Sequence, residues 1–211
     1  FSVDEVVSSR DVAVARLNEA ALDLTWSAIT AGHDSFADIP ARVTDLIDGT
    51  TDWDKAEGFL FLSSARWDAA LQRRLTETLR RRPRPLVVAN PDLVAPREGG
   101  LTLEPGLFAH DLADALGLLP RWYGKPFPDA FCEARNRLPG IPPHRIAMVG
   151  DTLHTDVLGG AAAGMGTVLI TAHGLFAGFD TGPYIDRSGI RPSVISATKV
   201  ALSMRLRRSS L

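Results

Sequence analysis

Residues 145–165, RIAMVGDTLHTDVLGGAAAGM, decide the fold that we predict for this chain. The apolar run at residues 146–149 is typical of a buried strand. Gly150 lets the chain turn sharply after that run, so Asp151 stands just past the carboxyl end of the strand. In open α/β sheets, ligands bind outside the carboxyl ends of the strands. The stretch therefore predicts an α/β fold with a carboxylate at its usual ligand site.

A second carboxylate follows five residues later. We expect Thr155 and Asp156 to begin a helix, because short oxygen side chains accept the amide hydrogens left unpaired at a helix N-terminus. Small residues at 159–164 would let that helix pack closely against the sheet. Two carboxylates at a strand end suit a hard divalent cation. The alternative is a strand–turn–helix whose aspartates only cap and turn.

The composition is that of an ordinary globular protein. The 211 residues allow one large domain or two small ones, with 45% hydrophobic and 23% charged residues. The formal net charge of −2 gives no reason to expect nucleic acid or a membrane surface as a partner, and no apolar stretch approaches a membrane-spanning length. Cys132 is the single cysteine, so no disulfide can form within the chain and a cytoplasmic location is expected.

Apolar runs and helical periodicity alternate along the chain, which favours α/β layers with a mostly parallel sheet. Strands are predicted at residues 3–8, 27–30, 41–47, 58–62, 86–89, 121–123, 146–149, 167–171 and 193–196. Helices are predicted at residues 11–21, 67–82, 106–116 and 128–138, from residue 155, and at the end of the chain. Gly-rich residues 172–192 are expected to be irregular.

Three motifs follow predicted strands or precede predicted helices. They are Asn90-Pro91-Asp92, Gly124-Lys125-Pro126, and Gly150-Asp151 with Thr155-Asp156. Together they resemble the haloacid dehalogenase (HAD)-type phosphatases, and within them the class IIA subfamily of nitrophenylphosphatase-like and nucleotide-phosphatase-like proteins. The GKP and VGDxxxTD pair, at this spacing, is the specific part of the resemblance.

The resemblance implies a domain plan. The fold would be α/β, a Rossmann-like HAD core with an inserted α/β cap of the C2 type. Residues 1–21 would be a core segment carrying the third core strand and its helix. Residues 22–119 would form the cap, and residues 120–211 would return to the core with the metal site.

The resemblance also implies roles for three side chains. Asp151 corresponds to the acid that binds magnesium, and Asp156 to the second acid, which supports it. Lys125 corresponds to the lysine that steadies the nucleophile and the phosphoryl oxygens. Without the neighbouring acidic motif, Lys125 would be interpreted as a surface lysine in a Gly-Pro turn.

Residues 90–96 resemble the cap loop that leans over the substrate. In that case five side chains would take part in substrate binding, namely Asn90, Asp92, Leu93, Val94 and Ala95. A plain turn at Asn90-Pro91-Asp92 is the alternative interpretation.

The expected chemistry is magnesium-dependent hydrolysis of a small phosphorylated metabolite. Phosphoryl transfer needs charge neutralised on the phosphoryl oxygens and in-line positioning. A Mg²⁺ ion held by carboxylates, with a lysine as a point charge, supplies both. The resemblance implies an aspartyl-phosphate intermediate, and a homodimer is a further expectation.

One departure limits this expectation. The family's nucleophile stands in a DxDG(T/V) motif, which these residues do not contain. Asp48-Gly49-Thr50 follows Asp45 at the wrong spacing, and residues 23–25 end a predicted helix. Two strand–helix units of the resembled core are missing as well. We therefore expect the chain to be an N-terminally shortened form that is inactive by itself.

The alternative is a non-catalytic HAD-like binding or assembly module that has lost the nucleophile, with the apolar face of residues 67–79 as a dimer contact. A phosphotransferase on the same core is a third reading. His154 and His173 are interpreted as ordinary loop residues, since no partner spacing supports metal ligation. Cys132 is interpreted as a packing residue.

Overall fold

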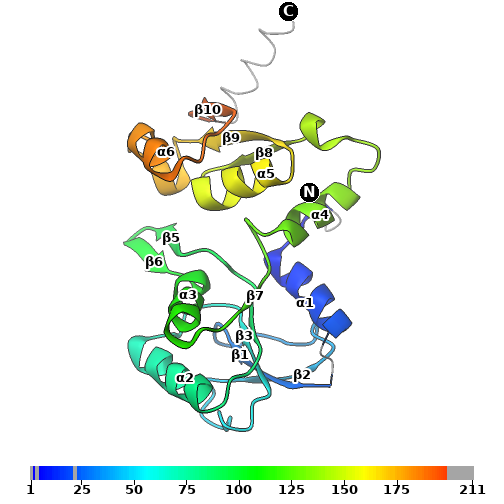
Figure 1. The fold of residues 1–211 in the computed structure, drawn as a ribbon, viewed down its shortest axis with the longest axis vertical. Helices are drawn as coiled ribbons and strands as arrows, with labels where there is room; N and C mark the ends of the chain where they lie inside the picture. Colours follow the sequence, from blue (N-terminus) through cyan, green and yellow to red (C-terminus); the bar gives the residue numbers. More distant parts are fainter. Residues whose placement is uncertain (1, 3–4, 21–22, 199–211) are drawn as a thin grey trace, which may run out of the picture. The chain divides into compact units, whose positions relative to one another are not determined.

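The computed structural model describes residue 2, residues 5–20 and residues 23–198, without the side chains of residues 18–20. The chain forms two compact units, Phe1–Gly124 and Lys125–Leu211, and each is described here by itself (Figure 1). Among the residues so described, no helix is long and apolar enough to cross a membrane.

The first unit is built on a parallel sheet with strands in the order β2-β1-β3-β4-β7. These strands are β1 (Thr25–Ile29), β2 (Arg42–Asp45), β3 (Gly58–Phe61), β4 (Leu86–Val88) and β7 (Arg121–Trp122). The helices of this unit are α1 (Ser9–Ala20), α2 (Ala69–Arg81) and α3 (Pro105–Leu116). A two-stranded antiparallel hairpin, β5 (Val94–Arg97) and β6 (Gly100–Leu103), stands apart from the sheet.

Apolar clusters cover both faces of this sheet, and successive residues of a strand contribute to opposite faces. In β3, Phe59 and Phe61 belong to an apolar cluster with residues of α2 and α3, whereas Leu60 belongs to a second cluster with Leu17 of α1. Figure 1 shows the same arrangement, with α2 and α3 on one side of the sheet and α1 on the other. Strands covered on both faces read as continuous apolar runs, which is why the sequence predicted them.

Helix α2 begins where its sequence provides a cap. The Asp68 side chain accepts hydrogen bonds from the amides of Ala70 and Leu71. Leu75 and Leu79 are fully buried in the core of the first unit. The face of residues 67–79 is therefore not available as a dimer contact, and that interpretation is wrong.

The second unit contains a three-stranded parallel sheet in the order β10-β9-β8. Its strands are β8 (Ala147–Gly150), β9 (Gly166–Ile170) and β10 (Val194–Ser196). Its helices are α4 (Pro128–Asn136), α5 (Leu158–Ala162) and α6 (Gly182–Ser188), with a π-helical turn η3 (Leu153–Val157) that runs into α5 and 3₁₀ turns η2 (Pro143–Arg145) and η4 (Gly174–Phe176). Leu153, Val157, Leu169, Phe176 and Ile185 form its apolar cluster.

The predicted α/β class with parallel sheets is confirmed, whereas three local predictions differ from the structure. Residues 5–8 form no strand and lead directly into α1, while residues 3 and 4 of that predicted strand lie outside the described residues. Residues 172–192 were expected to be irregular but contain α6. The hairpin of β5 and β6 was not predicted. The predicted terminal helix lies outside the described residues.

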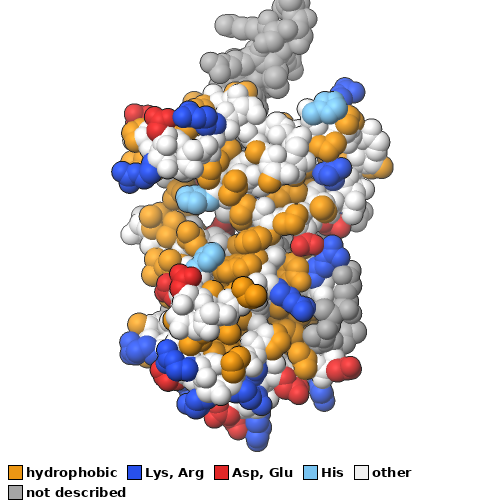
Figure 2. Space-filling model, in the orientation of Figure 1, with side chains coloured by type: hydrophobic (Ala, Val, Ile, Leu, Met, Phe, Trp, Pro, Cys, Tyr) orange, Lys and Arg blue, Asp and Glu red, His pale blue; other side chains and the backbone are white. Residues whose placement is uncertain are grey.

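Charges of both signs share the surface. Figure 2 shows acidic and basic side chains interspersed around the part of the first unit that Figure 1 labels α2 and β2. One surface ion pair of the first unit joins Arg81 Nη2 to Asp54 Oδ1 at 3.0 Å. The predicted division into cap and core domains stays a prediction.

Candidate active site

The candidate site lies in the second unit, at the edge where β8 and β9 end. The two strands are parallel, so their carboxyl ends share one edge of the sheet. Asp151 follows β8 directly, and the chain after β9 returns to it through η4. There the Leu175 amide donates a hydrogen bond of 2.9 Å to Asp151 Oδ2. This hydrogen bond orients the half-buried Asp151 carboxylate.

Asp156 is the buried centre of the site, with only 2% of its surface exposed. Its Oδ2 accepts hydrogen bonds of 3.1 Å from the amides of both Asp151 and Thr152. Its Oδ1 accepts one of 2.5 Å from Lys125 Nζ. Buried carboxylates are stable when amides and a cation satisfy them in this way.

These bonds correct the predicted helix cap. Thr155 and Asp156 do not begin the helix, because η3 already starts at Leu153 and Thr155 is buried within it. A capping side chain accepts amides that follow it, whereas Asp156 accepts the amides of Asp151 and Thr152, which precede it. Asp156 therefore holds the turn after β8 in shape.

Two glycines permit the close approach of the chain to these carboxylates. A Cβ atom at Gly150 would stand 2.1 Å from Asp156 Cγ. A Cβ atom at Gly174 would stand 1.8 Å from Asp151 Oδ2, and this residue also has a φ of +76°. Side chains at either position would displace an acid of the site, so the site requires glycine at both.

Lys125 connects the buried acid to the surface. It is the first residue of the second unit, and its side chain is 45% exposed although Asp156 beside it is 3% exposed. Its ammonium therefore keeps a solvent-facing side while it pairs with Asp156. A cation held in this position can neutralise an incoming anion.

The donor set suits a hard cation. Asp151 Oδ2 is bonded to Leu175, and within the described part of the chain no hydrogen bond to Oδ1 is seen. Mg²⁺ is usually held by one or two carboxylates together with waters and substrate phosphate. No group of three or more His, Cys, Asp or Glu side chains that could share a metal ion occurs among the described residues. One oriented carboxylate beside a second acid fits Mg²⁺ in its usual hydrated form.

The predicted substrate residues belong to the first unit. Asn90 Oδ1 accepts the Asp92 amide at 3.1 Å, which closes a turn after β4, and Asn90 Nδ2 donates to Glu104 Oε2 at 3.3 Å. Leu93 is exposed, and Val94 and Ala95 begin β5. The structure brings Lys125, Asp151 and Asp156 together, whereas Asn90, Asp92, Leu93, Val94 and Ala95 share the other unit. The substrate role of these five residues stays a prediction.

The rejected nucleophile candidate has a structural role. Asp48 Oδ1 accepts the Thr50 amide at 2.8 Å, as in an Asx turn. Asp45, three residues earlier, pairs with Arg66 Nη2 at 2.5 Å. Both acids thus stabilise the loop after β2.

Sequence reasoning missed the backbone of Gly174 and Leu175. A glycine shortly after the predicted strand at residues 167–171 was the available signal, but nothing in the sequence linked it to Asp151. His154, His173 and Cys132 are exposed, and none of them takes part in the hydrogen bonds of Asp151, Asp156 or Lys125.

Comparison with known proteins agrees with this geometry. Residues 122–177, which include Lys125, Asp151 and Asp156, match the HAD-hydrolase-like family. The acid sugar phosphatase of Staphylococcus aureus is 34% identical over 82 residues, which are 39% of this chain and 31% of that protein. The dihydroxyacetone phosphatase of Corynebacterium glutamicum is 34% identical over 84 residues, 40% of this chain and 30% of that protein. The match thus spans about a third of the length of these relatives.

Solved structures share the fold over nearly the whole chain. A possible sugar phosphatase of the HAD superfamily from Cytophaga hutchinsonii has a TM-score of 0.78 at 23% identity, and the match covers 94% of this chain and 72% of that one. The p-nitrophenyl phosphatase of Archaeoglobus fulgidus has a TM-score of 0.75 at 21% identity, with 96% and 75% covered. The chain thus has the α/β fold of these solved structures. Residues 122–177 thus match the HAD-hydrolase-like family, and the fold is the one that the HAD-superfamily resemblance implied.

Proposed function

We propose that the protein is a magnesium-dependent phosphatase of small phosphomonoesters. The observation that carries this proposal is the buried Asp156, which binds Lys125 with one oxygen and the amide of Asp151 with the other. This arrangement places a cation and a free carboxylate oxygen at one strand end. A phosphoryl group needs two positive charges around its oxygens, one from a lysine and one from a metal ion, which the carboxylate oxygen would hold.

Each residue has one task in this proposal. Asp151 would hold Mg²⁺ through the oxygen that Leu175 leaves available, and a bound Mg²⁺ would neutralise the phosphoryl oxygens. Lys125 binds and orients the phosphoryl group with the solvent-facing side of its ammonium. Asp156 holds the Lys125 ammonium in place. Asn90 and residues 92–95, in a cap of residues 22–119, would select the leaving group.

The covalent step requires an aspartate nucleophile, which attacks phosphorus as the alkoxide leaves and which water then regenerates. The sequence offers no DxDG motif for this task. We propose that a longer form of the protein supplies this motif and that the chain of 211 residues binds the metal without turnover. The non-catalytic module is the second candidate, favoured by the same missing motif.

The first test is calorimetric titration of the chain with Mg²⁺, with and without inorganic phosphate. We expect saturable binding that Asp151→Asn weakens at least roughly tenfold, because the oriented carboxylate is lost. Asp186→Asn is the matched control, since Asp186 is an exposed acid of the same unit that pairs with Arg191. Absence of Mg²⁺ binding, or equal effects of the two variants, would contradict the metal site.

The second test separates the two candidates. Phosphate release is measured for a form of the protein that includes a DxDG segment, with a panel of small phosphomonoesters. The phosphatase should require Mg²⁺ and lose activity in Asp151→Asn. Metal binding without any phosphate release from that longer form would instead support the non-catalytic module.

A further inference from the structure

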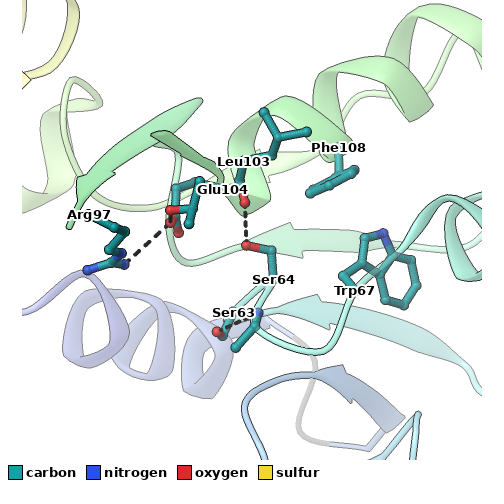
Figure 3. A pocket seen from close by; sticks show the side chains of 9 residues that line it. Ser63, Ser64, Trp67, Arg97, Leu103, Glu104 and Phe108 are labelled. Carbon is teal, nitrogen blue, oxygen red and sulfur yellow. Dashed lines mark hydrogen bonds and ion pairs between the residues drawn. The ribbon is translucent and has the colours of Figure 1, made fainter. Parts of the chain in front are cut away.

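A pocket of about 400 Å³ lies wholly within the first unit (Figure 3). Its floor is the loop after β3, with Ser63 and Ser64, and its other walls come from β6 and the start of α3. Strands β3 and β4 are parallel neighbours, so this loop and the chain that follows β4 leave the same edge of the sheet. Crevices at the carboxyl ends of parallel strands are where α/β proteins bind ligands. The size is that of a small-molecule site.

One end of the pocket is a rigid apolar wall. Trp67 and Phe108 both pack on Phe61, with ring centroids 5.3 and 6.1 Å from it. Gln72 accepts the Trp67 indole N–H at 2.8 Å and donates to the Phe108 carbonyl at 2.9 Å. The polar edge of the indole is thereby satisfied, and the wall offers the pocket apolar ring surface. Figure 3 shows the two rings together at one end.

The other end carries one charge of each sign. Arg97 Nη2 and Glu104 Oε1 are 3.4 Å apart, longer than the usual 2.7–3.2 Å of such bonds. The Arg97 side chain is 63% exposed and can follow a ligand, whereas the Glu104 side chain is 10% exposed and fixed. Glu104 accepts hydrogen bonds from Thr102 Oγ1 at 2.8 Å and from Asn90 Nδ2 at 3.3 Å. A carboxylate has about four acceptor positions, so Glu104 can accept a further donor.

A ligand that fits this pocket has an apolar body and, at one end, a cation close to an anion. We propose that the pocket binds a free α-amino acid with an aromatic or large apolar side chain. Its ammonium would bind Glu104 and its carboxylate would bind Arg97, while its side chain would lie on Trp67 and Phe108. A ligand of this kind replaces the long Arg97–Glu104 contact with two matched ion pairs.

Neutral and singly charged ligands match the pocket less well. A ligand that fills the pocket removes water from both charges, and a buried charge left without a partner is unfavourable. An amine would satisfy Glu104 but leave its positive charge beside Arg97. A carboxylic acid would satisfy Arg97 but leave its negative charge beside Glu104. A polyol would bring no charge to Arg97 or Glu104. The proposal does not rest on the phosphatase function, because no residue of the pocket belongs to the second unit.

The test titrates the chain with L-phenylalanine, phenethylamine, 3-phenylpropanoate and glucose in a calorimeter. L-Phenylalanine should bind saturably, and loss of either charge from the ligand should weaken binding roughly tenfold or more. Glucose should bind more weakly still. No saturable binding of L-phenylalanine, or tighter binding of glucose, would overturn the proposal.

Two variants assign each charge to its partner. In Arg97→Met, L-phenylalanine and phenethylamine should bind alike, because the carboxylate has lost its partner. In Glu104→Gln, which keeps the shape of the side chain, L-phenylalanine and 3-phenylpropanoate should bind alike. Arg73→Met and Glu98→Gln, at exposed positions of the same unit outside the pocket, should retain both preferences. Preferences that persist in the pocket variants would show that the ligand binds elsewhere.

A structural readout accompanies the titrations. Leu93 O accepts the Glu104 amide at 3.0 Å, and Glu104 also holds Asn90. Amino-acid binding should therefore slow amide hydrogen exchange in β5 and β6, and Arg97→Met should remove this protection. Unchanged exchange in the hairpin at saturating L-phenylalanine would contradict binding at this place.

Discussion

Gly174→Ala tests how the second unit holds Asp151. The substitution adds a Cβ atom 1.8 Å from Asp151 Oδ2, about half of a normal non-bonded separation of roughly 3.5 Å. It also places a side chain at a φ of +76°, in the left-handed region that disfavours alanine. The carboxylate must turn away, and the Leu175 hydrogen bond of 2.9 Å is lost with it.

Two contributions set the expected magnitude. The left-handed backbone costs about 1–2 kcal/mol for a residue with a Cβ atom. The lost hydrogen bond to a charged group costs about 1.5–3 kcal/mol. Gly178→Ala is the matched control, because its φ is +81° and nothing lies within 4 Å of its Cβ position. We expect about 3–5 kcal/mol for Gly174→Ala and only about 1–2 kcal/mol for Gly178→Ala.

The assay is native-state hydrogen exchange of the amides in β9, which reports the stability of the second unit. A second readout is the Mg²⁺ affinity of the two variants, which only Gly174→Ala should lower. If the two variants lose equal stability within about 0.5 kcal/mol and bind Mg²⁺ alike, the Leu175 contact does not hold Asp151 and the reasoning is wrong.

Three further variants test other contacts. Arg10 donates a hydrogen bond to Asp38 and keeps the pKa of that carboxyl below its usual value. The stability that this contact contributes is therefore present above about pH 4 and is lost as the pH falls through the lowered pKa. Asp38→Asn should remove about 0.5–1 kcal/mol of acid-dependent unfolding free energy, and an unshifted Asp38 titration by NMR would contradict this prediction. Leu79→Ala should cost about 2–5 kcal/mol in urea unfolding, against less than about 0.5 kcal/mol for the 94% exposed Leu119→Ala; equal costs would disprove the core assignment. Lys125→Met leaves a buried carboxylate without its cation and should destabilise β9 in hydrogen exchange by about 3 kcal/mol, whereas Lys125→Arg should restore most of it.

The strands and the acidic turn could be predicted because they depend on neighbouring residues. The run at residues 146–149 is apolar and ends at Gly150, so a strand and a turn could both be predicted from neighbouring residues. The strand forms, but it is only partly buried rather than buried as predicted. Parallel strands end at one edge, which is enough to place Asp151 at a ligand site. Lys125 could be joined to Asp156 only through the family resemblance, because 31 residues separate them.

The remaining features depend on partners distant in sequence. The Leu175 amide reaches Asp151 across 24 residues through the register of β8 and β9. The strand predicted over residues 3–8 had a suitable apolar pattern, but a strand is stabilised by hydrogen bonds to a neighbour, and the Glu5 amide bonds to Ser2 instead. Strand β6 is exposed at every position, so alternation could not reveal it.

Helix α6 shows a different failure, because its signals were present. Pro183 stands in its first turn, and Gly189 ends it with a φ of +71° and an amide bonded to Ile185. A proline at the start and a glycine just past the end are the usual marks of a short helix. The high glycine content of residues 172–192 obscured this pattern. The positions of Pro183 and Gly189, rather than the overall glycine content, indicate the helix.

Hydrogen bonds within the protein orient both carboxylates of the site in the second unit. Three backbone amides, those of Asp151, Thr152 and Leu175, already donate to the two carboxylates, and Lys125 supplies the positive charge. Repulsion between the acids is therefore relieved by the protein itself. Mg²⁺ binding should require little rearrangement, so saturating Mg²⁺ should leave hydrogen exchange in β8 unchanged within experimental error. Strong protection of β8 by Mg²⁺ would show instead that the metal ion, rather than the amides, assembles the site.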